Sequence, residues 1–295
     1  MTEISYKIAG IGELLWDVTP NGKQLGGAPS NCIYHALDSG IDGYVVSAVG
    51  NDQDGRDIKS RVKELGVSVS YIHTAEGYPT GTVGVELDDK GKPDYLIYED
   101  VAWDHIEWSD LLRALASRLD GLTFGSLCQR SKVSRNTILK FLESTSSDCI
   151  RVFDVNLRKG YYNRKTILES LERSDVVKLN DEELPVLAGY LGYKGSQEEI
   201  LKQFLEGYQL DLIAYTKGSE GSVLMSPTDQ SYLEVPETKV ADTIGAGDAF
   251  TGILLKGLLQ NIDLGEIHKT ATQVAAHVCT QQGATPQVPV ELLKF

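Results

Sequence analysis

Short, almost continuously apolar runs recur along this chain, and stretches with helical character lie between them. Six runs stand out, at residues 7–11, 44–49, 121–124, 150–153, 175–179 and 210–216. Strands that are apolar on both sides are typical of a parallel sheet buried between two layers of helices. Strands alternating with helices indicate βαβ units. The sequence therefore predicts an α/β fold with helices on both faces of a mainly parallel sheet.

Helix boundaries are marked by residues with a clear physical role. Glycine ends a helix because it adopts left-handed backbone angles without strain, and Asp or Ser caps a helix start by accepting an exposed N–H. The expected helices are 29–39 followed by Gly40, 55–65 preceded by Asp52 or Asp54 and followed by Gly66, and 200–205 after a Ser196–Glu199 capping box.

Two regions, at about residues 13–25 and 79–104, break this rhythm. Each contains strand-like segments separated by turn residues, Pro20-Asn21-Gly22 in the first and Asp88–Gly91 in the second. We interpret them as one small antiparallel β-sheet that forms a lid beside a ligand-binding site. The alternative is an edge hairpin that has no role in binding. No linker or low-complexity segment interrupts the chain, so we expect residues 1–295 to form a single domain that carries this lid.

The charge and the cysteines limit the partners and the compartment. With 28 Lys and Arg against 42 Asp and Glu, the net charge is −14, which argues against nucleic acid or an anionic membrane surface as a partner. The four cysteines include no Cys-x-x-Cys pair, and no apolar run approaches the length of a membrane helix. There is no basic segment followed by an apolar core at the N-terminus. We therefore expect a cytoplasmic protein with reduced thiols.

The segment Gly245-Ala246-Gly247-Asp248 is the strongest functional signal. Small residues let the backbone approach a ligand closely, and an apolar helix is expected to follow at 249–260. The start of a helix presents free N–H groups and a positive dipole end, which favour an anion. A carboxylate beside bound phosphate is useful if it accepts the proton of an attacking hydroxyl. The alternative is a glycine-rich loop in which Asp248 only caps the helix.

Two other phosphate-binding motifs are absent or incomplete in this sequence. The chain has no Gly-x-x-x-x-Gly-Lys-Ser/Thr segment, which excludes a P-loop protein. Gly10-x-Gly12 lacks the third glycine of a dinucleotide fingerprint, which disfavours a dehydrogenase.

Three motifs in order resemble the ribokinase-like (pfkB) carbohydrate kinase family. They are Gly26-Gly27-Ala28-Pro29-Ser30-Asn31, Asn180-Asp181-Glu182-Glu183 and Asp242–Asp248. The resemblance covers nearly the whole chain, and the segments 12–17 and 24–29 look most like the bacterial fructokinase branch. It implies a three-layer α/β/α sandwich with a β lid. It also implies a phosphotransferase that acts on an alcohol group with ATP and Mg²⁺.

The resemblance also implies roles for residues on the nucleotide side. Asp248 would be the catalytic base, and Gly245, Ala246 and Gly247 would supply N–H groups to the transferring phosphoryl group. Asn180 and Glu183 would organise Mg²⁺ through water, with an ordinary helix start as the alternative. The remaining implied positions are Thr216, Lys217 and Gly218 beside the nucleotide, Ala276 near the adenine, and Asp242 at a candidate K⁺ site.

On the acceptor side, the resemblance implies that Asp17, Gly27 and Asn31 bind the sugar. Asp154, Asn156 and Arg158 alternate after a strand and would share one side if the chain stays extended. Arg158 would then offset charge on a substrate, with a structural Arg–Asp pair as the alternative. Trp103 is a candidate to close over the sugar, or else to pack between subunits.

The leading functional prediction is an ATP-dependent sugar kinase whose acceptor is fructose. Other acceptors stay open: 2-keto-3-deoxygluconate, another hexose, ribose or a nucleoside. An inactive, sugar-sensing member of the fold is the opposing class, and the intact segment from Gly245 to Asp248 disfavours it. One face of a small lid sheet is often covered by a second copy, so a homodimer through the lid is expected.

Overall fold

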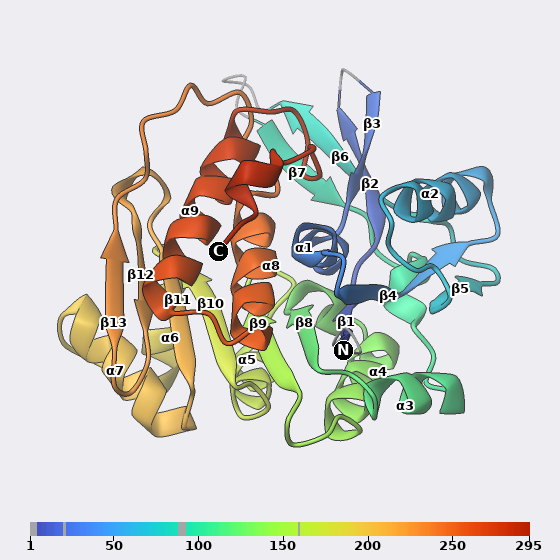
Figure 1. Cartoon of the computed structure of the whole chain (residues 1–295). Coiled ribbons are helices and arrows are strands. Elements are labelled where there is room, and N and C mark those ends of the chain that lie inside the picture. Colours follow the sequence, from blue (N-terminus) through green and yellow to red (C-terminus); the bar gives the residue numbers. More distant parts are fainter. Residues whose placement is uncertain (1–4, 20–21, 88–92, 159) are drawn as a thin grey trace.

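The computed structural model describes residues 5–19, 22–87, 93–158 and 160–295, so the expected turns at Pro20-Asn21 and Asp88–Gly91 lie outside the described residues. Within the described part of the chain, nine strands form the main sheet in the order β13-β12-β11-β10-β9-β8-β1-β4-β5 (Figure 1). In this order, each strand from β11 to β5 pairs in parallel with its neighbour. Strands β12 and β13 are antiparallel additions at the edge next to β11. The prediction of a mainly parallel sheet is confirmed.

The six predicted strands are all present, with small shifts at their ends. The strands of the main sheet are β1 (Tyr6–Ile11), β4 (Ile41–Gly50), β5 (Ile72–Ala75), β8 (Gly121–Gly125), β9 (Ile150–Asp154), β10 (Val176–Asn180), β11 (Leu212–Thr216), β12 (Ser222–Met225) and β13 (Gln230–Leu233).

Helices cover both faces of this sheet and enclose two hydrophobic cores. Neighbouring residues of one strand enter different cores, as Val152 and Phe153 of β9 do, because side chains alternate across a sheet. One core is closed by α1 (Ala28–Ala36), α2 (Gln53–Glu64), α8 (Ala246–Leu259) and α9 (Leu264–Cys279). The other is closed by α3 (Asp110–Ala116), α4 (Lys132–Glu143), α5 (Arg164–Leu171), α6 (Glu183–Leu191) and α7 (Gln197–Tyr208). The predicted three layers are confirmed.

The boundary residues act largely as predicted. Asp52 caps α2 by accepting the N–H of Gly55 at 2.7 Å, and Ser196 forms the capping box of α7 with Glu199. The stop at Gly40 was wrong: α1 ends at Ala36, because the backbone of Leu37 is already extended. All four cysteines are free thiols. No helix in the described ranges combines the length and apolar character that a membrane span needs.

The lid is a four-stranded sheet in the order β3-β2-β6-β7, built from β2 (Leu15–Thr19), β3 (Gly22–Gly26), β6 (Gly81–Leu87) and β7 (Pro93–Ile97). Each of its two hairpins is antiparallel, as predicted, but β2 and β6 pair in parallel and make the lid sheet mixed. The two hairpins are separated in the chain by α1, β4, α2 and β5. This long connection allows β6 to run in the same direction as β2.

Candidate active site

The candidate residues gather where the parallel strands of the main sheet end. Glu13 follows β1, Asp154 ends β9, Asn180 ends β10 and Thr216 ends β11. Asn180 and Thr216 are direct neighbours in the parallel register. The carboxyl edge of an open α/β sheet is where ligands bind, because loops and helix N-termini converge there. The fold thus brings residues that are far apart in the chain to one edge of the sheet.

Asp248 lies in the first turn of α8 and meets the acceptor side of the site. The side-chain amide of Asn31, in α1, donates a hydrogen bond of 2.8 Å to Asp248 Oδ2. Burial, and next the charge of Asp154, raise the pKa of Asp248 to about 6, against the lowering effects of Asn31, Lys178 and Arg158. Asp248 is therefore mostly ionised at neutral pH, yet a better proton acceptor than an ordinary aspartate.

A buried ion pair packs beside the first turn of α8. Lys178 Nζ lies 3.1 Å from Asp154 Oδ1, and both residues are buried. Thr251 donates to Asp154 Oδ2 at 2.8 Å and to the carbonyl oxygen of Gly247 at 3.0 Å. A Cβ atom on Gly247 would lie only 2.9 Å from Lys178 Nζ. A positive charge is thus held directly behind the backbone where we expect the phosphoryl group.

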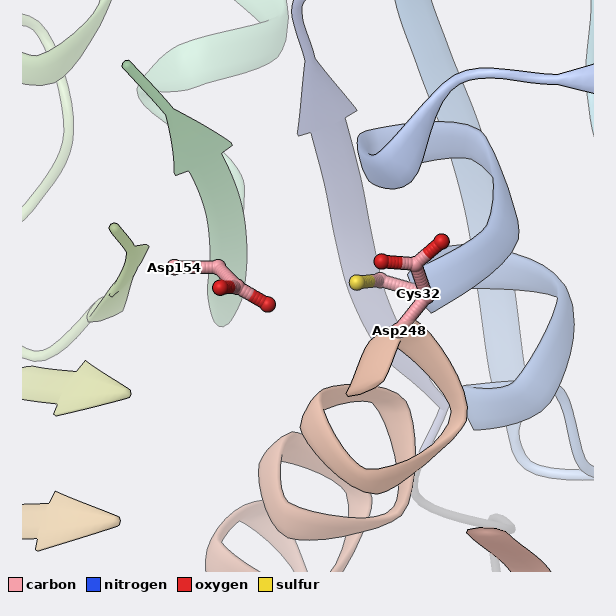
Figure 2. Close-up of side chains that lie close together, drawn as sticks. All are labelled: Cys32, Asp154 and Asp248. Carbon is pink, nitrogen blue, oxygen red and sulfur yellow. The ribbon is translucent and has the colours of Figure 1, made fainter. Parts of the chain in front are cut away.

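Figure 2 shows how three side chains from separate elements converge here. Asp154 comes from β9, Cys32 from α1 and Asp248 from α8, and one ligand atom of each lies within 4.8 Å of the others. Both oxygens of Asp154 already accept hydrogen bonds from Lys178 and Thr251. The cluster is therefore a packed junction between the three elements.

The loop before α8 is fastened to the loop after α9. Gly245 has φ of 80°, and a Cβ there would lie 2.5 Å from Ala284 Cα, so only glycine fits. Asp242 accepts N–H groups from Ile244 at 3.0 Å and from Gly283 at 3.2 Å. The carboxylate of Asp242 thus joins the two loops, and its role at a K⁺ site stays a prediction. Ala276 is buried within α9.

Acidic side chains surround the predicted acceptor site. Glu13 is 3% exposed, and burial raises its pKa to about 7. Asp17 lies in β2, where burial and the charge of Asp248 raise its pKa to about 6. Gly27, at the start of α1, has φ of 119°, and a Cβ there would lie 2.4 Å from the carbonyl oxygen of Glu13. The exposed Arg158 lowers the pKa of both Glu13 and Asp17 by its charge.

The motif of Asn180 and Glu183 forms a reciprocal helix cap. Asn180 Oδ1 accepts the N–H groups of Glu182 and Glu183, while Glu183 Oε2 accepts the N–H of Asn180 at 2.9 Å. Glu183 Oε1 accepts the N–H of Leu157 at 2.8 Å, and the residue is 4% exposed. Direct coordination of Mg²⁺ by these oxygens does not fit this arrangement. The predicted contact through water stays a prediction.

On the same edge, Thr216 is the last residue of β11, and Lys217 and Gly218 follow it. The ammonium of Lys217 lies 5.0 Å from the centre of the Tyr232 ring, which holds its side chain over β13. Gly218, with φ of 53°, begins a short 3-10 helix, Gly218–Glu220. The loop of Lys217 and Gly218 thus lies at the carboxyl end of β11, and Asn180 lies at the carboxyl end of the adjacent strand β10.

Two acceptor-side expectations need correction. Trp103 is 1% exposed, and the Arg130 guanidinium lies 3.9 Å from the centre of its ring, so no face is open to a sugar. The chain does not stay extended after Asp154, because Asn156 has φ of 40°. Asp154 is buried against Lys178, whereas Arg158 is exposed and donates to the carbonyl oxygen of Leu157. The alternative of an Asp154–Arg158 pair is replaced by Asp154–Lys178.

Sequence reasoning missed Glu13, Lys178 and Thr251 as members of the site. Each lies within or beside a segment that the sequence singled out: Glu13 follows Gly12, Lys178 stands two residues before Asn180, and Thr251 follows Asp248 by three. A lysine within an otherwise apolar strand was the signal for Lys178, since a buried charge needs a partner.

Comparisons with known proteins agree with this geometry. A family model described as pfkB family carbohydrate kinase matches residues 3–291. An uncharacterized sugar kinase of Pyrococcus horikoshii is 32% identical, over 98% of this chain and 95% of that protein. Its crystal structure has a TM-score of 0.82 over 95% of this chain and 93% of that one.

Two fructokinases are also similar. The fructokinase of Salmonella typhimurium is 28% identical over 98% of each chain. The fructokinase of Vibrio cholerae, solved with fructose, ADP and a calcium ion, is 26% identical with a TM-score of 0.80, over 96% of this chain and 95% of that one.

Proposed function

Because this chain belongs to the pfkB family of carbohydrate kinases, we propose that it transfers the γ-phosphoryl group of ATP to a hydroxyl group of fructose. The chain has the ribokinase-like α/β fold and is an ATP-dependent sugar kinase. The choice of fructose is supported by its likeness to the fructokinases of Salmonella typhimurium and Vibrio cholerae.

The observation that carries the proposed mechanism is the hydrogen bond between Asn31 and Asp248. It orients the carboxylate in the first turn of α8 toward the acceptor side. Because Asn31 occupies Oδ2, we assign Oδ1 to the sugar hydroxyl. As the hydroxyl oxygen attacks the γ-phosphorus, its proton passes to Asp248. A pKa near 6 suits this step, since the base is ionised at neutral pH but not too weak.

In the proposed mechanism, the backbone from Gly245 to Gly247 binds the phosphoryl group that is transferred. Magnesium bound with ATP would neutralise part of the phosphate charge, and Asn180 and Glu183 would hold it through water. The N–H groups at the start of α8 lack acceptors within the helix and point toward the incoming charge. Negative charge spreads over the phosphoryl oxygens in the transition state, and fixed N–H donors stabilise it there. The buried Lys178 adds a positive charge behind Gly247.

Formation of ADP tests the function directly. In the presence of ATP and Mg²⁺, we expect fructose to stimulate ADP release well above the rate without acceptor, and above that with ribose or a nucleoside. A coupled ADP assay across this panel gives kcat/KM for each acceptor. A higher kcat/KM for ribose or a nucleoside would contradict fructose as the substrate.

We further propose that a second copy of the chain covers the outer face of the lid. Val18, Gly84 and Leu96 stand opposite one another on β2, β6 and β7, and Val18 and Leu96 are exposed. Tyr98, just beyond β7, is 48% exposed. Light scattering is expected to give twice the mass of the chain, and Leu96→Lys to shift it to the monomer mass. A wild-type monomer at micromolar concentration would contradict the dimer.

A further inference from the structure

His35, in the last turn of α1, is a buried titratable residue that the proposed mechanism does not use. It is 3% exposed, and its ring nitrogen Nε2 lies 2.9 Å from the carbonyl oxygen of Ala284. Burial, opposed by this hydrogen bond, lowers the pKa of His35 to about 4, so the ring is neutral at neutral pH. Because a carbonyl oxygen only accepts hydrogen bonds, we assign the ring proton to Nε2.

The need to fill space does not explain a histidine at this position. The second ring nitrogen, Nδ1, is buried and has no hydrogen-bond partner in the described part of the chain. Leaving a buried polar atom unpaired is unfavourable, and an apolar side chain of similar size would avoid the loss. The specific contribution of the His35 ring is therefore its hydrogen bond to Ala284.

Ala284 is packed against the backbone that we expect to bind the phosphoryl group. A Cβ atom on Gly245 would lie 2.5 Å from Ala284 Cα and 2.8 Å from the carbonyl oxygen of Ala284, the atom that His35 binds. The preceding residue, Gly283, donates its N–H to Asp242 in the loop before α8. His35 thus fixes the carbonyl group against which Gly245 packs.

The helix that carries His35 also holds the proposed base. Asn31 lies one helical turn before His35, so both side chains project from the same face of α1. Asn31 donates to Asp248 in the first turn of α8. One turn further along α8, a Cβ atom on Gly252 would lie only 3.0 Å from His35 Cβ, so the two helices are in close contact. Helix α1 therefore contacts both the base and the loop beside the phosphoryl-binding backbone.

The relative position of these two groups matters for phosphoryl transfer. The sugar hydroxyl must approach the phosphorus while its proton reaches Asp248, and the N–H donors must face the phosphoryl oxygens at the same time. Glycine adopts many backbone conformations, so the turn from Gly245 to Gly247 does not fix its own position. Contacts from outside the turn have to do so.

We propose that His35 is a positioning residue for phosphoryl transfer: its Nε2–H fixes Ala284, and Ala284 holds the N–H groups of Gly245–Gly247 in place relative to Asp248. The inference rests on the base and the N–H donors assigned in the proposed function, and it applies to any sugar that the enzyme accepts. His35 acts through Ala284 and Gly245, and not on the substrate itself.

Two substitutions of His35 separate its hydrogen bond from its volume. His35→Leu removes the donor and keeps an apolar side chain, whereas His35→Gln keeps an N–H close to the position of Nε2. With the acceptor that the wild type turns over fastest, we expect His35→Leu to lower kcat by roughly 10- to 100-fold, as a misplacement of about 1 Å implies. The KM for sugar should change little, and His35→Gln should recover most of the wild-type kcat.

Binding of a transition-state mimic gives a readout that does not depend on turnover. Aluminium fluoride together with MgADP imitates the phosphoryl group in transfer, and its binding depends on the same N–H donors. Isothermal titration calorimetry should show that His35→Leu weakens binding of this mimic by a factor similar to the loss in kcat. The affinity for MgADP alone should fall much less.

A second buried histidine provides the matched control. The ring of His268 accepts or donates hydrogen bonds of 2.8 Å to Ser222 and to Ser231, where α9 packs against β12 and β13. His268→Leu should lower the free energy of unfolding but leave kcat and mimic binding close to the wild type. Urea denaturation shows which variants are folded under the assay conditions, and His35→Phe replaces His35→Leu if the latter is not.

The outcomes distinguish this inference from the proposed function. A wild-type kcat in folded His35→Leu would overturn the inference and leave the proposed function intact. Equal losses of affinity for MgADP and for the mimic, or an equal loss of kcat in His268→Leu, would indicate a general structural role and would also overturn it. ADP release that no acceptor stimulates in the wild type would contradict the proposed function, and mimic binding would then decide the inference alone.

Discussion

Asp248→Asn is expected to lower kcat by roughly 10²- to 10⁴-fold, the usual contribution of a general base. Asparagine has nearly the same shape, so it can stay beside Asn31 in the first turn of α8, but it cannot take the proton of the sugar hydroxyl. MgATP should still bind, because the proposed mechanism assigns its phosphates to backbone N–H groups and not to this carboxylate. Steady-state kinetics together with a binding measurement for ATP would check both expectations.

The pH profile gives this experiment a second readout. In the wild type, kcat/KM, which reports ionisation of the free enzyme, should rise with pH through about 6 as Asp248 loses its proton. The part of this acidic limb that comes from Asp248 should disappear in Asp248→Asn. Asp110→Asn, on an exposed helix start, removes the same charge far from the site and serves as the control. Near-normal turnover in Asp248→Asn would exclude it as the base.

Lys178→Met is expected to lower the free energy of unfolding by about 3–5 kcal/mol, the usual effect of breaking a buried ion pair. Methionine fills a similar volume but leaves Asp154 buried without its cation. Burial alone would lower the pKa of Lys178, yet Asp154, Glu183 and Asp248 together raise it above the ordinary value. The lysine is thus charged and strongly held in the folded protein. Urea denaturation of the whole chain measures the change.

A second lysine provides the matched control. Lys202 pairs with Glu198 at 2.6 Å on the exposed side of α7, one helical turn apart. Lys202→Met should change the free energy of unfolding little, because solvent screens an exposed pair. Equal stability of the two variants would contradict the view that Lys178 and Asp154 form a buried, mutually dependent pair.

Local patterns were enough to predict the layers and much of the site. Apolar runs such as 150–153 identified strands because a strand buried on both faces has no polar side. The segment from Gly245 to Asp248 could be interpreted because a helix start and its loop are close in the sequence. The capping box at Ser196 and Glu199 was found for the same reason.

Local sequence patterns could not predict contacts between segments that are far apart in the chain. Asn31 and Asp248 are 217 residues apart, and their meeting depends on α1 packing against α8. Lys178 finds Asp154 because β9 and β10 are neighbours in the sheet, an order that apolar runs do not contain. Trp103 was misjudged because its burial depends on its packing in the hydrophobic core and against Arg130, contacts with distant segments that the sequence does not reveal.

The three acidic side chains of the acceptor site have a consequence for folding itself. In the empty protein, the pKa values of Glu13, Asp17 and Asp248 are raised to about 7, 6 and 6. The folded state therefore holds these protons more tightly than the unfolded chain does. These groups favour folding most below about pH 4, and that contribution disappears as the pH rises through 6 to 7.

At neutral pH the unoccupied site thus opposes folding, and the rest of the structure must compensate. A sugar that donates hydrogen bonds to these carboxylates stabilises their ionised forms and drives protons off. Sugar binding, proton release and resistance to unfolding are then linked: added sugar at neutral pH increases both proton release and stability, whereas a higher pH increases proton release and lowers the stability that these groups contribute.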